Sequence, residues 1–264
     1  MKIVLFGSNG MLGTYLNSYL SGKHQVVALT REDYDLSMVT KYSLHKFLGD
    51  ISGDFVVINA AGVIKQRDYD PVDMIMVNSV FPNMLGKYKA KTGHEVIHIT
   101  TDCVFSGLDG NYDEKSLHDC TDYYGQSKSL GEHPTLTTIR TSIIGEEKVN
   151  QKSLLEWVRS NKGNTINGYL NHKWNGVTCL QLAKVIGDMI KDGSYWTGVE
   201  HVHSPDATNK AELCGMINDV YDLGITIEPM NTPTKCYRDL SSIKNKLTIP
   251  TLPEQIEEMY NYEL

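Results

Sequence analysis

The sequence lacks paired cysteines, long apolar runs and an excess of positive charge. Its 5 cysteines are scattered with no Cys-x-x-Cys pair, which argues against a zinc site or a disulfide framework and favours a reducing compartment. The 9 histidines show no metal-ligand spacing. Apolar stretches such as residues 55–58 are far too short to span a bilayer, and a net charge of −7 disfavours non-specific binding to nucleic acid. We therefore expect a cytoplasmic protein with no metal, no membrane segment and no nucleic-acid partner.

What the sequence does contain is a regular alternation of short apolar runs with helical patterns. The runs at residues 2–6, 26–29, 55–59 and 96–99 are bounded by polar residues or glycine, as buried parallel strands are. Between the first two, Leu12, Leu16 and Leu20 fall on one helical stripe. This rhythm predicts right-handed crossovers and an α/β fold, namely a doubly wound parallel sheet of the Rossmann type.

The pattern also predicts two interleaved lobes. We expect residues 1–145 plus about 175–203 to form a dinucleotide-binding domain, and residues 146–174 plus 204–264 to form a smaller substrate-binding lobe. No Pro/Gly linker separates them, and Asn209 with Glu212 predicts a capping box for a helix of the smaller lobe. Such a lobe would close a cleft over the carboxyl ends of the strands, where ligands bind in open α/β sheets.

Three glycines mark the turn after the first expected strand. Gly7, Gly10 and Gly13 permit a tight turn and let backbone N–H groups approach a pyrophosphate at a helix N-terminus. The spacing is Gly-x-x-Gly-x-x-Gly rather than Gly-x-Gly-x-x-Gly, so a generic strand-to-helix turn is the alternative. The position directly after an apolar strand favours the nucleotide interpretation.

The end of the second expected strand carries no acid of the kind that an NAD-specific site places at the adenosine ribose. Arg31 follows at once, and a guanidinium suits a 2′-phosphate, so NADPH is predicted with NADH as the alternative; the adjacent Glu32 and Asp33 leave this choice open. The residues expected at the cofactor are Gly7, Ser8, Asn9, Gly10, Met11, Leu12, Gly13, Arg31, Asp35, Leu36, Asn59, Ala60, Ala61, Gly62, Asn78, Tyr124 and Lys128.

Tyr124 and Lys128 are four residues apart in a helical region, so they lie on one face. The ammonium would favour the phenolate and lower a phenol pKa that is about 10 in free tyrosine. Alone, the pair is more often a solvated helix face. Here it follows a Gly-rich turn and a strand that ends in the run Thr100-Thr101-Asp102-Cys103. The three parts in this order favour a ketone reductase with a nucleotide cofactor.

These residues resemble the extended short-chain dehydrogenase/reductase family, in particular its dTDP-4-dehydrorhamnose reductase branch. The resemblance implies a reductase of a nucleotide-linked 4-keto-6-deoxyhexose that gives an NDP-L-rhamnose-type sugar. It also implies that Tyr124 donates a proton, Thr101 hydrogen-bonds the carbonyl oxygen and Lys128 holds the nicotinamide ribose. The motifs that carry it are residues 7–13, 59–61, 77–78, 101–107, 124–128, 131–132 and 140–142.

Cys103 departs from the plain reductase branch, which usually has tyrosine at this position. It is similar instead to GDP-fucose synthase and to nucleotide-rhamnose synthases, which both epimerise and reduce. That likeness implies 3,5-epimerase activity, with Cys103 as the base and Lys173, or next His172, as the acid. The alternative is a plain reductase in which Cys103 is a small apolar residue and Lys173 a solvated charge.

Other readings stay open. One branch of the same family resembles the regulatory subunit of methionine adenosyltransferase and acts as a binding partner, although the intact Thr101, Tyr124 and Lys128 weigh against that role here. A 4-epimerase with tightly held NAD⁺ is a third interpretation. A nucleotide-sugar substrate and a homodimer are the expected partners. The residues expected to contact the substrate, with a surface or core role as the alternative, are Lys65, Val104, Phe105, Trp174 and Arg238, and Arg67 has a weaker claim.

Overall fold

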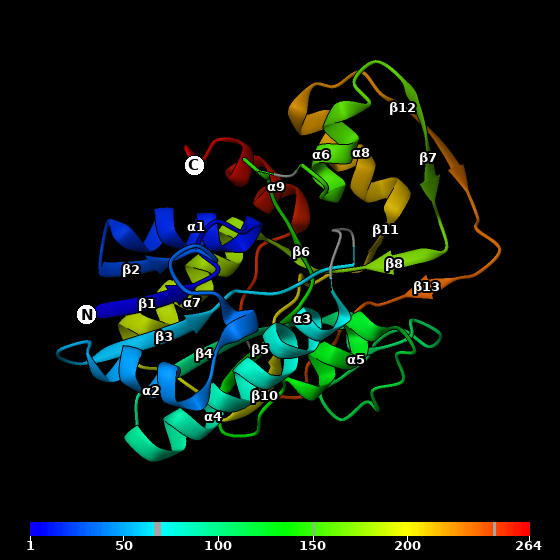
Figure 1. Cartoon of the computed structure of the whole chain (residues 1–264). Coiled ribbons are helices and arrows are strands. Elements are labelled where there is room, and N and C mark those ends of the chain that lie inside the picture. The colour runs from blue at the N-terminus through cyan, green and yellow to red at the C-terminus, as the bar shows by residue number, and fades with distance from the viewer. Residues whose placement is uncertain (66–69, 150, 245–246) are drawn as a thin grey trace.

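The computed structural model describes residues 1–65, 70–149, 151–244 and 247–264. A parallel sheet of six strands forms its centre, in the order β10-β5-β4-β3-β1-β2 (Figure 1). The strands are β1 (Lys2–Phe6), β2 (Gln25–Leu29), β3 (Phe55–Asn59), β4 (Val96–Thr101), β5 (Thr137–Thr141) and β10 (Gly198–His201). The expected doubly wound α/β fold is confirmed.

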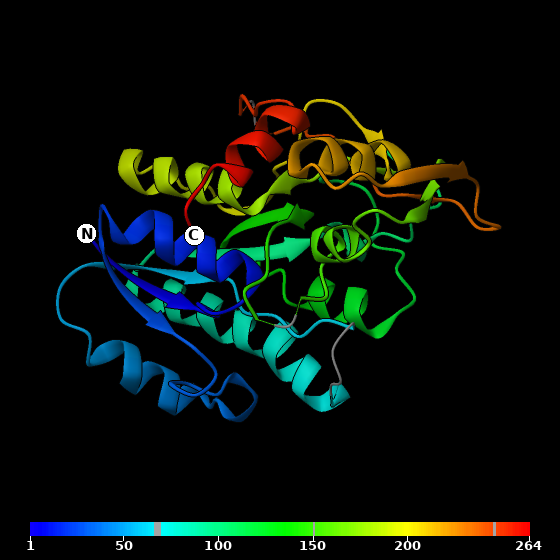
Figure 2. The same ribbon diagram turned by 90° about the horizontal axis from the view of Figure 1, so that it is seen from above.

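Helices cover both faces of this sheet, as the view from above shows (Figure 2). On one face, α1 (Met11–Ser21) packs against α7 (Cys179–Asp192), and the stripe with Leu12, Leu16 and Leu20 is buried there as predicted. The other face carries α2 (Lys41–Gly49), α4 (Phe81–Thr92) and α5 (Tyr123–Leu130). Short helical segments complete this half: η1 (Leu36–Met38), α3 (Pro71–Ile75), η2 (Met76–Val80) and η3 (Asp102–Val104).

A smaller lobe stands over the carboxyl ends of the strands. Its strand β8 (His172–Trp174) lies between β11 (Thr208–Asn209) and β13 (Cys236–Tyr237), and β7 (Thr165–Tyr169) pairs with β12 (Thr226–Met230). The predicted capping box of Asn209 and Glu212 is confirmed at the start of α8 (Lys210–Tyr221). The lobe also contains α6 (Leu154–Ser160) and α9 (Leu252–Tyr260), and β6 (Ile143–Ile144) pairs with β9 (Val177–Thr178) where the chain passes between the two halves. No helix in the described part of the chain is long and apolar enough to cross a membrane.

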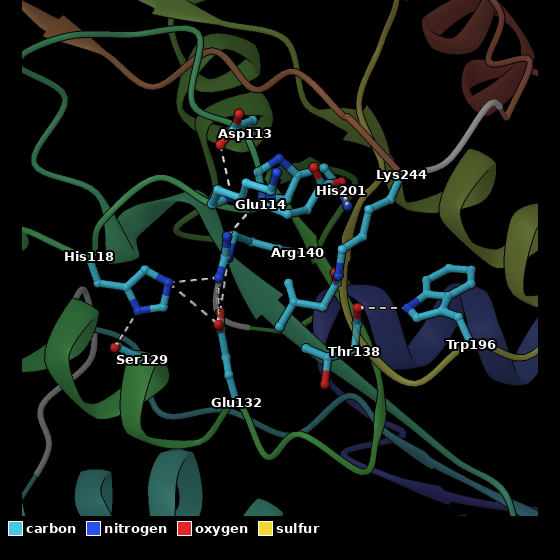
Figure 3. Close-up of polar contacts among 12 residues, drawn as sticks. Asp113, Glu114, His118, Ser129, Glu132, Thr138, Arg140, Trp196, His201 and Lys244 are labelled. Carbon is cyan, nitrogen blue, oxygen red and sulfur yellow. Dashed lines mark hydrogen bonds and ion pairs between the residues drawn. The ribbon is translucent and has the colours of Figure 1, made fainter.

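A buried arginine on the sheet forms an ion pair with Glu132, which follows α5 (Figure 3). Arg140 on β5 is 2% exposed and binds both carboxylate oxygens of Glu132, just after α5, at 3.0 and 2.5 Å. It also reaches Nε2 of His201 at 2.9 Å and Nε2 of His118 at 2.7 Å. Because a guanidinium only donates, both imidazoles accept at Nε2 and are neutral. Arg140 therefore has a structural role and fixes the helix that carries Tyr124.

This arrangement predicts a loss of stability in acid. Burial and then Arg140 lower the pKa of His201 to about 4, below its unfolded value of about 6.5. The unfolded state therefore binds more protons between these values, so stability falls as the pH drops from about 6.5 to 4, by about 2 kcal/mol between pH 7 and pH 5. Chemical denaturation of wild type and His201→Gln at both pH values checks this. A variant with the same pH dependence as wild type would contradict it.

Candidate active site

A cleft of about 580 Å³ opens at the carboxyl ends of the central strands. On one side it is lined by the Gly-rich turn that joins β1 to α1. On the other side it is lined by Thr101, Cys103, Tyr124 and Lys128. The polar residues of the expected catalytic set and the glycines of the expected cofactor turn therefore face one cavity.

The Gly-rich turn has the geometry that its glycines predict. Gly7 has a φ of +80°, and the backbone N–H groups of Gly7 and Ser8 each donate to the Leu29 carbonyl at 3.0 Å. A Cβ on Gly13 would lie 1.9 Å from the Gly7 carbonyl oxygen, so only glycine fits there. Gly10 caps α1 without a side-chain hydrogen bond, which leaves N–H groups at the helix N-terminus free for an anion.

Arg31 lies at the outer end of the cleft, with its side chain 69% exposed. It forms ion pairs with Asp35 and with Asp73, each at 3.3 Å. Asp35 is also occupied as the cap of η1, where it accepts the Ser37 N–H at 2.9 Å. The expected adenine neighbours Asp35 and Leu36 line the cleft, and so does Asp73, which was not among the expected site residues.

Two of the expected cofactor residues, Asn59 and Asn78, do not line the cleft. They lie behind its wall and hydrogen-bond the segment that forms it. Asn59 is fully buried and contacts Nδ1 of His98 at 3.1 Å. Asn78 is also buried, and its side chain holds both the N–H and the carbonyl of Val63 at 2.9 Å. They shape the segment of Ala60, Ala61 and Gly62, which does line the cleft. Ser8 and Gly13 do not line the cleft either, whereas Asn9, Met11 and Leu12 do.

Tyr124 and Lys128 lie on one side of α5, which begins where Asp122 accepts the Gly125 N–H. Lys128 is 5% exposed, and its ammonium donates to the Ile99 carbonyl at 2.9 Å. Burial lowers its pKa to about 8, against the opposing charge of Glu132. The expected lowering of the Tyr124 pKa is wrong for this structure. Burial raises that pKa, and Cys103 raises it further, because the phenol is removed from water while Lys128 is bonded elsewhere.

Thr101 is the last residue of β4 and lines the cleft together with Tyr124. Its hydroxyl accepts the Cys103 N–H at 3.2 Å and donates to Asp102 at 3.1 Å, and Thr101 opposes the rise of the Tyr124 pKa. Asp102 is 3% exposed, and burial raises its pKa while Arg238 opposes the shift. Thr101 and Asp102 are therefore hydrogen-bonded to each other at the end of β4, and Thr101 lines the same cleft as Tyr124.

Cys103 has the neighbouring cation that its expected role as a base requires. The Nη1 atom of Arg238 donates to the Cys103 sulfur at 3.2 Å, while Nε of the same guanidinium donates to the Phe105 carbonyl at 3.1 Å. Burial and then Asp102 nevertheless raise the pKa of the thiol to about 12. The structure thus brings Arg238 to the site, and it keeps Cys103 protonated at neutral pH.

Four other expected residues do not line the cleft. Val104 and Phe105 are fully buried, and Phe105 stacks on Tyr112 at 4.2 Å between ring centres, so their side chains form a small core and do not reach a substrate. Strand alternation along β8 turns Trp174 inward, where it is 4% exposed, and leaves Lys173 exposed over the ring of Tyr237 at 5.0 Å. Among the described residues, the Lys173 ammonium makes no hydrogen bond or ion pair with the Cys103 thiol.

Lys65 lines the cleft, with its ammonium 3.8 Å from Asp122, and Arg67 lies outside the described residues. Sequence reasoning missed one cation of the smaller lobe. Lys210, the first residue of α8, has its ammonium 5.1 Å from the centre of the Trp174 ring and within the electrostatic reach of Asp102 and Cys103. Nothing local in the sequence relates it to these residues, because the contact joins segments that are about 100 positions apart.

The family model described as RmlD substrate binding domain matches residues 1–165. The chain belongs to this family. Among curated members of the reductase branch, dTDP-4-dehydrorhamnose reductase of Mycolicibacterium smegmatis is 32% identical over 140 residues, 51% of this chain and 41% of that protein. The enzyme of the same name from Burkholderia thailandensis is 33% identical over 135 residues, 50% of this chain and 44% of that protein. The matched part of the chain thus spans less than half the length of either relative.

Solved structures agree with this RmlD assignment at the level of the fold. A dTDP-4-dehydrorhamnose reductase of Clostridium acetobutylicum superposes with a TM-score of 0.81 at 21% identity over 98% of both chains. The Bacillus anthracis enzyme of the same name, solved in complex with NADP, gives a TM-score of 0.83 at 18% identity over 98% of both chains. The resemblance to the reductase branch of the extended dehydrogenase family is confirmed.

Proposed function

We propose that this protein is an NADPH-dependent reductase of the C4 ketone of a nucleotide-linked 4-keto-6-deoxyhexose, with dTDP-4-dehydrorhamnose as the first substrate to test. The observation that carries the proposal is the meeting of Thr101, Tyr124 and Lys128 opposite the Gly-rich turn in one cleft. The names of the curated relatives support the substrate class, and the NADP complex of a structural relative supports the cofactor.

The residues present fit such a cofactor. The N–H groups at the start of α1 suit its pyrophosphate, and Gly62 lies beside the Lys128 ammonium, which a Cβ there would contact at 3.7 Å. When bound, the reduced nicotinamide supplies the hydride. Tyr124 donates the proton to the carbonyl oxygen, which contributes about 10²–10⁴-fold to the rate. Thr101, which lines the same cleft, would hydrogen-bond the carbonyl oxygen, and Lys128 would hold the nicotinamide ribose.

The direct test is oxidation of NADPH, followed by its absorbance, with dTDP-4-dehydrorhamnose and with the corresponding UDP and GDP sugars. A reductase consumes NADPH only when a keto sugar is present and forms the 6-deoxyhexose in equal amount. A regulatory binding subunit would bind nucleotide and give no turnover, and a 4-epimerase would be purified with bound NAD⁺ that absorbs near 260 nm. Either result would reject the proposal.

We expect Arg31→Ala to reduce the preference for NADPH over NADH about tenfold, measured as the ratio of kcat/KM values. The guanidinium lies at the cleft mouth between Asp35 and Asp73, where a 2′-phosphate would give it a third anionic partner. Asp73→Asn is the matched control, because it keeps Arg31 but removes a competing carboxylate, so it should raise the ratio. An unchanged ratio in Arg31→Ala would show that Arg31 does not bind the 2′-phosphate.

A second candidate function is 3,5-epimerisation before reduction, and the contact of Arg238 with Cys103 favours it. With a thiol pKa of about 12, the thiolate is scarce at pH 7. If Cys103 is the base, solvent deuterium should therefore enter C3 and C5 of the 4-keto sugar without NADPH, and about tenfold faster per pH unit between pH 7 and pH 9. Mass spectrometry of the recovered sugar measures this.

Two variants separate the chemistries. Cys103→Ala should abolish the exchange and still reduce a sugar that already has the L configuration. Lys173→Ala should leave a single epimer if Lys173 returns the proton. Because the Lys173 ammonium lies over Tyr237, it would have to turn toward the cleft to do so. Wild-type protein without exchange at any of these pH values would leave a plain reductase.

A further inference from the structure

His98 lies in the middle of the central sheet, and the proposed reaction gives it no role. It is on β4, has no exposed surface, and pairs in the strand register with Asn59 at the end of β3. Burial, and after it the charge of Lys128, lower the pKa of the imidazole well below its ordinary value, so the ring is neutral. A neutral imidazole has one nitrogen that donates and one that accepts. Its neighbours decide which nitrogen carries the proton.

The side-chain amide of Asn59 determines that choice. Its Oδ1 accepts the N–H of Ala61 at 3.2 Å, so the amide oxygen faces Ala61. The amide nitrogen Nδ2 therefore faces Nδ1 of His98, at a distance of 3.1 Å. Because Nδ2 only donates, Nδ1 of His98 accepts, and the proton of the neutral ring is on Nε2. One orientation of the amide satisfies both neighbours, and it requires an acceptor at Nδ1.

The other nitrogen of the ring forms no such contact. Nε2 of His98 is buried and has no hydrogen-bond partner in the part of the chain that the structure describes. A buried donor without a partner lowers stability, and an apolar side chain at this position would avoid that loss. Within the described residues, the hydrogen bond with Asn59 is thus what the polar ring contributes at this position.

Ala61 in turn lies against the Gly-rich turn. A Cβ on Gly7 would be 2.7 Å from both N and Cα of Ala61, so the two backbones approach each other with no side chain between them. Next to this contact, the Ala60 N–H donates to the Phe6 carbonyl at 3.1 Å. Gly7, Ala60 and Ala61 all line the cleft. Because a rotamer change cannot relieve a contact between two backbones, a shift of Ala61 also displaces Gly7.

We propose that His98 is a positioning residue for the NADPH site. By accepting the Asn59 amide at Nδ1, it keeps Oδ1 of Asn59 directed at Ala61. Ala61 then holds Gly7 in the position that the cofactor's phosphates require. His98 does not line the cleft and acts only through Asn59. The inference rests on the proposed function, since it assumes that NADPH occupies this cleft.

Two substitutions of the same shape separate this role from packing. Leucine and asparagine match each other up to their δ atoms, so His98→Leu and His98→Asn remove nearly the same part of the ring. Asparagine alone has an oxygen that can accept from Asn59 in the place of Nδ1. We expect His98→Leu to raise the Kd for NADPH about tenfold, the effect of one lost buried hydrogen bond, and His98→Asn to stay within about threefold of wild type. Fluorescence titration measures both, and equal Kd values in the two variants would overturn the proposal.

Thr138→Val is the control for a change at the same level of the sheet. Thr138 on β5 pairs with His98 in the strand register and is fully buried, and its hydroxyl has no partner among the residues that the structure describes. The variant should bind NADPH as tightly as wild type. If it bound as weakly as His98→Leu, any change at this level of the sheet would disturb the site, and the specific role of His98 would be rejected.

The tautomer of His98 gives a readout that depends on no variant. Nitrogen NMR of protein with isotope-labelled histidine should show a neutral His98 ring with its proton on Nε2. A proton on Nδ1 would turn the Asn59 amide away from Ala61 and overturn the proposal, even if His98→Leu does not fold. Wild-type protein that does not bind NADPH would reject the proposed function as well. A wild type that binds NADPH and reduces a keto sugar, with a His98→Leu variant of equal affinity, would reject the positioning role alone.

Discussion

Replacing Tyr124 with phenylalanine is expected to lower kcat for ketone reduction by about 10²–10⁴-fold, because the phenol is the proton donor next to the carbonyl. The substitution removes one oxygen from a half-buried side chain and leaves the Gly-rich turn and Lys128 unchanged. NADPH binding, measured by fluorescence titration, should therefore stay within about threefold of wild type. The thermal midpoint should change little, since the substitution removes a single oxygen and keeps the ring in place.

The neighbouring residue supplies a matched control. Tyr123 precedes Tyr124 on the same helix, but its side chain is 68% exposed and does not line the cleft. Tyr123→Phe should keep wild-type kcat and KM. Near-normal turnover in Tyr124→Phe, or an equal loss in both variants, would remove Tyr124 from the reaction.

The sequence predicted the parts of the fold whose signals are local. Four strands and the stripe of α1 followed from the periodicity of their own residues, and the Gly-rich turn followed from three glycines. Tyr124 and Lys128 were predicted to share a helix face because their spacing determines it. Each of these features depends on neighbours within about ten positions.

Features that depend on packing between distant segments could not be predicted in this way. The Lys128 spacing predicted a lowered Tyr124 pKa, but burial, and after it the neighbouring Cys103, reverses the direction. Lys173 was selected from its place in the chain, whereas the alternation along β8 leaves it exposed and Lys210 approaches Asp102 instead. Phe105 was predicted to contact the substrate because it belongs to a site motif, but its side chain is buried in a small apolar cluster with Tyr112.

The second large effect concerns the turn itself, and Gly13→Ala should raise the Kd for NADPH at least tenfold while destabilising the fold by about 1–3 kcal/mol. The new Cβ would lie 1.9 Å from the Gly7 carbonyl oxygen and 2.9 Å from the Ser8 Cα, so it meets backbone that no rotamer change can move. Either α1 or the segment of Gly7 and Ser8 must shift, and that segment is the expected pyrophosphate site.

Helix propensity favours alanine over glycine by about 1 kcal/mol in a helix interior, so any measured loss of stability in Gly13→Ala understates the clash. Gly22→Ala is the matched control, because Gly22 caps the other end of α1 with a φ of −70° and has no atom within 4 Å of a new Cβ. It should keep wild-type stability within about 0.5 kcal/mol and wild-type NADPH affinity. Urea denaturation and NADPH titration of both variants check this. If Gly13→Ala bound NADPH as tightly as Gly22→Ala, the Gly-rich turn would not be the place where the cofactor's phosphates meet α1.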